Sequence, residues 1–175
     1  MTWINRTSAT ADVNGIRMHY VRAGQPGNPP LVLLHGWPEF WYTWSKVMPA
    51  LSDVYDVIAP DLRGFGDTEK PTGRALETYR IDDHVDDILA FIDALDLDRV
   101  GIVSHDVGAV VTQALAHKAP EKLRGLFFFN CPYGGIGPRW CAPEHLNDIW
   151  YQGFHQQPWA ADLLATSRDA IRLYF

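Results

Sequence analysis

Cysteine is scarce in this sequence: its 175 residues include two, Cys131 and Cys141. A structural zinc site needs four Cys or His ligands at short spacings, and no stretch provides such a set. We therefore expect no metal site, and nothing in the sequence requires another cofactor. Disulfides persist mainly in oxidising compartments, so two reduced thiols agree with a cytoplasmic protein.

Long basic runs and long apolar runs are also lacking. The chain has 15 Lys and Arg against 21 Asp and Glu, a formal net charge of −6, and the two signs are interspersed. Without a basic stripe we expect no nucleic-acid partner. No window approaches the roughly 18 consecutive apolar residues of a membrane-spanning helix, and residues 1–11 hold no apolar run typical of a signal peptide. We therefore expect no membrane partner.

What the sequence does contain is a globular composition, 47% hydrophobic and 21% charged. Near its start, residues 7–13 and 16–23 have the character of two strands, and Asn14-Gly15 separates them. Asn-Gly readily supplies the two positive-φ residues of a tight turn between alternating strands. The pattern predicts an antiparallel β-hairpin.

Short apolar runs then alternate with longer segments of helical periodicity. An apolar run of four to six residues is too short for a helix and is typical of a strand buried on both faces. The expected strands are residues 31–34, 55–59, 100–104 and 124–129, and the expected helices are 40–51, 78–95 and 107–119. This alternation predicts an α/β fold with a mostly parallel sheet, right-handed crossovers and the hairpin at one edge.

The pattern changes after Asn130. Residues 131–143 are loop-like, and residues 145–175 are rich in aromatic side chains with helical periodicity. We expect one domain over residues 1–131 and the beginning of a second, helical domain over residues 132–175.

The strongest local signal is Ser104-His105-Asp106-Val107-Gly108, between an expected strand and an expected helix. A sharp strand-to-helix turn exposes its central residue and needs small residues two positions before and after it. Ser104 and Gly108 meet that need if Asp106 is central. Centring the turn on Ser104 would place Ile102 and Asp106 there, and both are too large.

A carboxylate nucleophile implies a particular chemistry. It is ionised at neutral pH, so Asp106 needs no base to activate it, and attack on a saturated carbon would give an enzyme-bound ester. The positive N-terminal end of the following helix favours the charged form. The alternative for Asp106 alone is an ordinary helix N-cap.

A second signal, His35-Gly36-Trp37-Pro38, follows a buried strand. This loop can direct the backbone N–H of Trp37 toward the nucleophile, where it would form an oxyanion hole with the N–H of Val107. For the His35 side chain we favour a structural, hydrogen-bonded role. We also interpret residues 61–68, with their two glycines, as a structural loop.

Three segments, HGWPEFWYTW, PDLRGFGDTEKP and SHDVGA, together resemble the α/β-hydrolase superfamily and, within it, soluble epoxide hydrolases of the bacterial type. The resemblance extends from about Gly15 to the end of the chain. It implies an α/β-hydrolase fold, Asp106 as the nucleophile, and an oxyanion hole from the backbone of Trp37 and Val107.

A fourth segment, WYQGFHQ at residues 150–156, resembles the start of the cap domain in that family. The resemblance implies that the Tyr151 hydroxyl donates a hydrogen bond to the epoxide oxygen as the C–O bond breaks. The substrate would be a small apolar epoxide. The expected pocket between core and cap is lined by Trp37, Pro38, Phe40, Trp150 and Phe154, although about half of the aromatic residues in these segments would serve cap–core packing.

The chain departs from the family in three ways. Ser104 stands where relatives often have Gly, and Val107 where they often have an aromatic residue. The family's second tyrosine lies later in the cap, and its acid and its histidine base lie after the cap. This sequence does not reach those positions. We therefore expect an N-terminal fragment with an open sheet edge that is inactive and poorly stable alone.

Other functions stay open. A haloalkane or fluoroacetate dehalogenase shares the aspartate chemistry, and a non-catalytic fragment of the same fold would explain the missing base. The position of the strand-to-helix turn disfavours a serine esterase at this site. The sequence does not determine the oligomeric state, and a homo-oligomer is one alternative.

Overall fold

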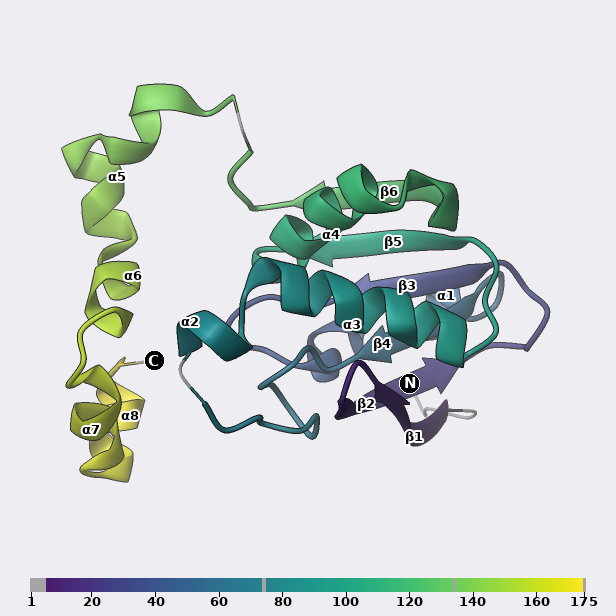
Figure 1. Ribbon diagram of the computed structural model, residues 1–175, viewed down its shortest axis with the longest axis horizontal. Helices are drawn as coiled ribbons and strands as arrows, with labels where there is room; N and C mark the ends of the chain where they lie inside the picture. Colours follow the sequence, from purple (N-terminus) through teal and green to yellow (C-terminus); the bar gives the residue numbers. More distant parts are fainter. Residues whose placement is uncertain (1–5, 74, 134, 175) are drawn as a thin grey trace. The chain divides into compact units, whose positions relative to one another are not determined.

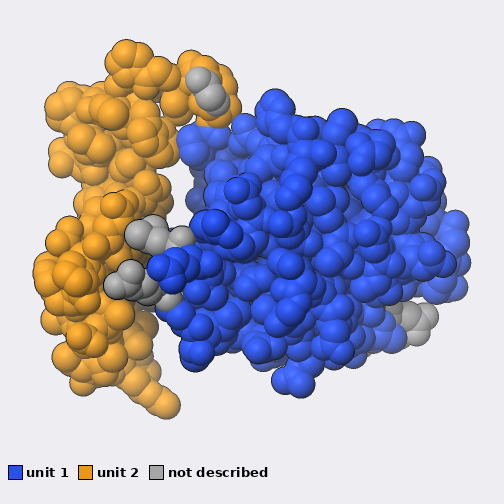
Figure 2. All heavy atoms as spheres, viewed as in Figure 1, with its two compact units in different colours: residues 1–132 blue, residues 133–175 orange. Residues whose placement is uncertain are grey.

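The computed structural model describes residues 6–73, 75–133 and 135–174. The chain forms two compact units, Met1–Pro132 and Tyr133–Phe175, which are coloured separately in Figure 2.

The first unit is built on a six-stranded sheet in the order β1-β2-β4-β3-β5-β6 (Figure 1). The strands are β1 (Arg6–Val13), β2 (Ile16–Ala23), β3 (Pro30–Leu34), β4 (Asp56–Pro60), β5 (Val100–His105) and β6 (Leu123–Phe129). β1 pairs with β2 and β2 with β4 in antiparallel fashion, whereas the β4-β3, β3-β5 and β5-β6 pairs are parallel. The expected sheet, mostly parallel with a hairpin at one edge, is confirmed.

The hairpin forms because its turn residues tolerate the left-handed region. Asn14 has φ 43° and Gly15 has φ 78°. Two successive positive φ angles give a turn whose twist matches that of the flanking strands. The pairing Val13↔Ile16 closes the turn, and the register continues without a break to Arg6↔Ala23.

Two helices cover one face of the sheet, α3 (Ile81–Ala94) and α4 (Val107–Lys118) (Figure 1). Their apolar residues pack on side chains of the strands in one buried cluster, which includes Met18, Val32, Leu34, Ile58, Ile88, Phe91, Ile102, Val111 and Leu115. A smaller cluster joins other strand residues to Trp44 and Met48; it contains Val21, Ala23, Leu33, Val57 and Ala59. The alternate residues of the strands thus belong to different clusters, as the twofold side-chain period of a strand requires.

Two expected helices are wrong in detail. Residues 40–51 form a 3₁₀ turn, Trp41–Trp44, and a separate short helix, α1 (Met48–Leu51), because Pro49 has no N–H to continue a helix and is accommodated only in a first turn. Residues 78–95 are divided between α2 (Ala75–Thr78) and α3. Arg80 is extended at the start of α3, and its N–H donates to Asp83 Oδ2 over 2.9 Å.

The second unit consists of short helices, as its periodicity predicts. After a 3₁₀ turn, Gly137–Cys141, come α5 (Pro143–Asp148), α6 (Trp150–His155), α7 (Ala160–Ala165) and α8 (Arg168–Tyr174). A further 3₁₀ turn, Pro120–Lys122, belongs to the first unit. Of the described residues of the second unit, Ala160 alone is buried. Across the described part of the chain, no helix has the length and apolar character needed to cross a membrane.

Candidate active site

The candidate nucleophile lies on a strained turn between β5 and α4. Asp106 is the residue before the first turn of α4 and has φ 52° and ψ −123°. A side-chain-bearing residue in this region costs on the order of 1–3 kcal/mol, which the surrounding structure must supply. Such a turn holds the side chain at the end of the strand, as the small-residue pattern of the sequence predicts.

Close packing under the turn explains why Gly108 follows it. A Cβ at Gly108 would lie 2.5 Å from the backbone oxygen of His35 and 2.6 Å from that of Leu34. The Gly108 N–H donates to the same His35 oxygen over 3.1 Å. Helix α4 therefore begins against the end of β3, and a larger residue would push the two apart.

Ser104, on the other side of the turn, is fully buried. Its hydroxyl lies 2.8 Å from the hydroxyl of Thr112 on α4, which also donates to the Gly108 carbonyl over 2.9 Å. Ser104 thus fixes the strand to the helix and is not presented to a substrate. This geometry supports Asp106, not Ser104, as the reactive residue of the turn.

The loop after β3 reaches the Asp106 carboxylate. The Trp37 N–H donates to Asp106 Oδ1 over 2.8 Å. The loop comes this close because Gly36 has no side chain: a Cβ there would lie 2.6 Å from Asp106 Cβ and from atoms of the His105 ring. The backbone donor that the sequence predicts therefore points at the predicted nucleophile.

The second predicted donor, the N–H of Val107, is not bonded to the carboxylate. Within residues 6–73, 75–133 and 135–174, neither this N–H nor Asp106 Oδ2 takes part in a hydrogen bond. The two oxygens of Asp106 are therefore unequal, since Oδ1 is held and Oδ2 is not. The role of Val107 in an oxyanion hole stays a prediction.

His35 has the structural role expected for its side chain. Its Nδ1 donates to the Gly36 carbonyl over 2.8 Å, and its Nε2 accepts from the Leu62 N–H over 2.9 Å. Burial lowers the pKa of His35 below its usual value, so the ring is held neutral. Both nitrogens are committed to backbone, and the ring joins the Trp37 loop to the start of the loop that follows β4.

Beside the nucleophile lies a pair of residues that the sequence does not predict. His105 Nε2 lies 2.8 Å from Glu39 Oε2, and the His105 ring packs between Trp44 and Phe129, with centroid distances of 5.9 and 5.4 Å. The pair spans 66 positions, so no local pattern could have joined the two residues. It ties the loop that carries the Trp37 donor to the residue before Asp106.

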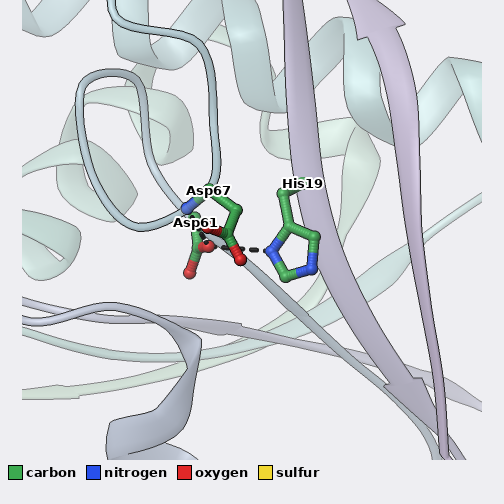
Figure 3. A group of neighbouring side chains, drawn as sticks. All are labelled: His19, Asp61 and Asp67. Carbon is green, nitrogen blue, oxygen red and sulfur yellow. Dashed lines mark hydrogen bonds and ion pairs between the residues drawn. The ribbon is translucent and has the colours of Figure 1, made fainter.

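The loop of residues 61–68 is internally bonded, as expected. Asp61 is fully buried; its Oδ1 accepts from the Trp41 N–H over 2.7 Å, and its Oδ2 from the Asp67 N–H over 2.9 Å and from His19 Nδ1 over 2.8 Å. A ligand atom of each of His19, Asp61 and Asp67 lies within 4.8 Å of the others, the spacing of a metal site (Figure 3). Hydrogen bonds already occupy the ligand atoms of Asp61 and His19.

The remaining predicted site residues divide between the two units. In the first, Phe40 is exposed and stacks on Tyr42 at a centroid distance of 5.9 Å. In the second, Trp150 and Phe154 pack at 6.0 Å, and the half-buried Tyr151 packs on His155 at 6.2 Å. The pocket that would join these residues with Trp37 and Pro38, and the contact of Tyr151 with a substrate, stay predictions.

Comparison with known proteins decides the family. A family model described as "alpha/beta hydrolase fold" matches residues 29–168. The chain belongs to the α/β-hydrolase fold family. This α/β hydrolase is 40% identical over 173 residues to a soluble epoxide hydrolase of Corynebacterium sp. (strain C12), covering 96% of the chain and 57% of that protein. It is 34% identical to human epoxide hydrolase 4, covering 89% and 43%.

Solved structures agree with these sequence relatives. The crystal structure of epoxide hydrolase VrEH1 from Vigna radiata matches with a TM-score of 0.78 and 35% identity, over 95% of this chain and 55% of that one. Epoxide hydrolase CorEH without ligand matches with a TM-score of 0.83 and 35% identity, over 97% and 58%. The α/β hydrolase described here thus spans 55% and 58% of these two solved chains, and 57% and 43% of the two sequence relatives.

Proposed function

We propose that this chain carries the nucleophile half of an epoxide hydrolase, in which Asp106 opens the epoxide by forming an ester with one of its carbons. The observation that supports this most is the Trp37 N–H on Asp106 Oδ1, at 2.8 Å, on a strained turn after a parallel strand. The relatives named epoxide hydrolase add the substrate class.

In the first step, Oδ2 of Asp106 attacks an epoxide carbon, because Oδ1 is already held by the Trp37 N–H. The C–O bond breaks, and its electron pair passes to the epoxide oxygen. That oxygen takes the phenolic proton of Tyr151, which we propose as the acid. The products are a hydroxyalkyl ester on Asp106 and a tyrosinate that regains its proton from solvent.

In the second step, water attacks the ester carbonyl carbon, and negative charge develops on Oδ1. A donor aimed at the oxygen where charge develops stabilises the transition state, and Trp37 N–H holds that position. Val107 N–H is the proposed second donor. Deprotonation of the water needs a base, which the family resemblance places beyond these 175 residues, so we expect the chain alone to form the ester without releasing diol.

Intact-protein mass spectrometry tests this proposal. After incubation with an aryl epoxide, we expect the chain to gain the mass of one epoxide molecule, localised to Asp106 by peptide mapping. Asp106→Ala should abolish the adduct, whereas Asp53→Ala, at an exposed aspartate, should leave it unchanged. Tyr151→Phe should slow adduct formation by about 100-fold, since a general acid typically contributes 10²–10⁴.

Circular dichroism before the incubation establishes that each variant is folded. A folded chain without an adduct at Asp106 would overturn the proposal. An Asp106 ester formed from a haloalkane with halide release, and not from the epoxide, would assign the site to a dehalogenase.

A further inference from the structure

A chain of hydrogen bonds joins a serine, a histidine and an aspartate that are not part of the Asp106 turn. The Ser8 hydroxyl lies 2.8 Å from His19 Nε2, and His19 Nδ1 lies 2.8 Å from Asp61 Oδ2. Ser8 is exposed, His19 is 6% exposed and Asp61 is fully buried. Figure 3 shows the His19 ring on its strand facing Asp61 in the adjoining loop.

The sheet brings the three residues together. β1, β2 and β4 are neighbours in the sheet, and the pairing Thr10↔His19 places Ser8, two positions from Thr10, diagonally across from His19 on the same face. Asp61 follows the last residue of β4, and its N–H donates to the His19 carbonyl over 2.9 Å. The alignment therefore follows from strand register.

The direction of the hydrogen bonds depends on the protonation of the His19 ring. With an ionised Asp61, which can only accept, and a neutral ring, His19 carries its proton on Nδ1 and its Nε2 lone pair accepts from the Ser8 hydroxyl. The Asp61 carboxylate is itself held by the N–H groups of Trp41 and Asp67. A hydroxyl on a neutral imidazole, oriented by a buried carboxylate, is the arrangement by which general-base catalysis activates serine.

A donor for an oxyanion lies next to the same hydroxyl. The His19 N–H donates to Thr68 Oγ1 and its carbonyl accepts from Asp61, so both groups point away from β1. Thr10↔His19 is therefore a pair without mutual hydrogen bonds, and so is Ser8↔Val21 two positions along the ladder. The Ser8 N–H then points to the outer edge of β1, where no strand of the described residues pairs.

A second carboxylate belongs to the same group. The exposed Asp67 side chain lies near His19 and Asp61, with a ligand atom of each residue within 4.8 Å of the others. We propose that Ser8, His19 and Asp61 form a second nucleophilic site, which attacks activated carboxylic esters and is independent of the Asp106 chemistry.

In this reaction Ser8 Oγ bonds to the ester carbonyl carbon, and its proton passes to His19 Nε2. Collapse of the tetrahedral intermediate breaks the bond to the alcohol, which leaves with the proton from His19. Water then attacks the acyl-Ser8, giving its proton to His19, and the acid is released as Ser8 regains a proton. The net reaction is ester plus water to acid plus alcohol.

Labelling with a fluorophosphonate reagent tests the site, because this reagent reacts with activated serine hydroxyls. We expect peptide mapping to place the label on Ser8 at least about 100-fold faster than on the other serines of the chain. Ser8→Ala should remove the label and the hydrolysis of p-nitrophenyl acetate above background. Labelling of Ser8 no faster than of other exposed serines would overturn the proposal.

His19→Gln should also remove the label, but this buried change can unfold the chain. Two single cysteine variants, at Ser8 and at Thr10, avoid that difficulty. Both residues are exposed on the same face of β1, and of the two it is Ser8 that is hydrogen-bonded to His19. Ser8→Cys should react with iodoacetamide at least about tenfold faster than Thr10→Cys at neutral pH, because a cation forming at His19 favours the thiolate. Equal rates would show a purely structural hydrogen-bond chain.

Discussion

Strands β5 and β6 are parallel neighbours of similar length, yet they differ strongly in burial. β5 pairs on both edges, and its residues alternate between buried and half-buried. On β6 only Leu123 is buried, while Phe127 is 63% and Phe129 43% exposed. Apolar composition alone thus does not decide burial. The strand that leads to the candidate nucleophile lies between two neighbours, whereas β6 is the edge strand of the described sheet and leaves its apolar side chains exposed.

The largest expected effect comes from truncating paired residues on the two strands. Ile102 on β5 is 1% exposed, and its register partner on β6, Leu126, is 40% exposed. We expect Ile102→Ala to lower the free energy of unfolding by about 2–5 kcal/mol, because it leaves a cavity. Leu126→Ala should cost less than about 1 kcal/mol. Urea denaturation measures both, and equal losses would mean that β6 is covered in solution.

Two glycines sharpen the same comparison. A Cβ added at Gly108 would collide with backbone oxygens, whereas a Cβ at Gly125 on β6 would have nothing within 4 Å. We expect Gly108→Ala to destabilise the chain by about 1–3 kcal/mol through overpacking, with Gly125→Ala near neutral. Thermal unfolding of the two variants gives the contrast. A tolerated Gly108→Ala would show that α4 can move away from β3.

Acid is expected to destabilise the chain through its buried histidines, His35 and His84, and not through β6, which has no histidine. Burial lowers the pKa of His35 and of His84 below the usual 6.5, so both are neutral in the folded chain. Their contribution to stability is complete above about pH 6.5 and is lost as the pH falls through that value toward the lower folded pKa, by up to about 1.4 kcal/mol per pH unit for each group.

Urea denaturation between pH 7.5 and pH 5 measures this loss. His84→Gln should make the dependence shallower, and His117→Gln, at an exposed histidine of α4, should not. A dependence unchanged by His84→Gln would contradict the assignment.

The smallest effect is expected where β5 is hydrogen-bonded to α4. Thr112→Val removes the hydroxyl that contacts Ser104 and the Gly108 carbonyl, and it leaves buried polar groups without that partner. We expect a loss of about 1 kcal/mol. The double variant with Ser104→Ala should recover part of that loss, since the unpaired Ser104 hydroxyl is then gone. A double variant with fully additive losses would argue against the pairing.

The parts of the fold that could be predicted from sequence depend on local chemistry. Asn14-Gly15 determines a tight turn, and short apolar runs such as residues 31–34 indicate strands. Small residues around Asp106 predict the strained turn. The break near Pro49 depends on the missing N–H of one residue, which the helical periodicity of residues 40–51 does not reveal.

Contacts between distant residues could not be predicted in this way. Glu39 lies against His105, Ser8 against His19 and His19 against Asp61 because of strand order and register. None of these contacts follows from a pattern within a short window. The Trp37 donor was predictable in part, because it belongs to a family motif that follows a buried strand. That it donates to Oδ1 of Asp106 and not to Oδ2 is a property of the folded loop.

The two-residue turn at Asn14-Gly15 fixes the strand register at the other end of its hairpin, where Ser8 and His19 lie. The turn sets which residue of β1 lies opposite each residue of β2, and side chains alternate between faces with a period of two. A slip of β1 by one residue along β2 would leave the hairpin recognisable but place Ser8 on the opposite face from His19. The environment of the Ser8 hydroxyl would then change with strand register, without a change in any residue that contacts it.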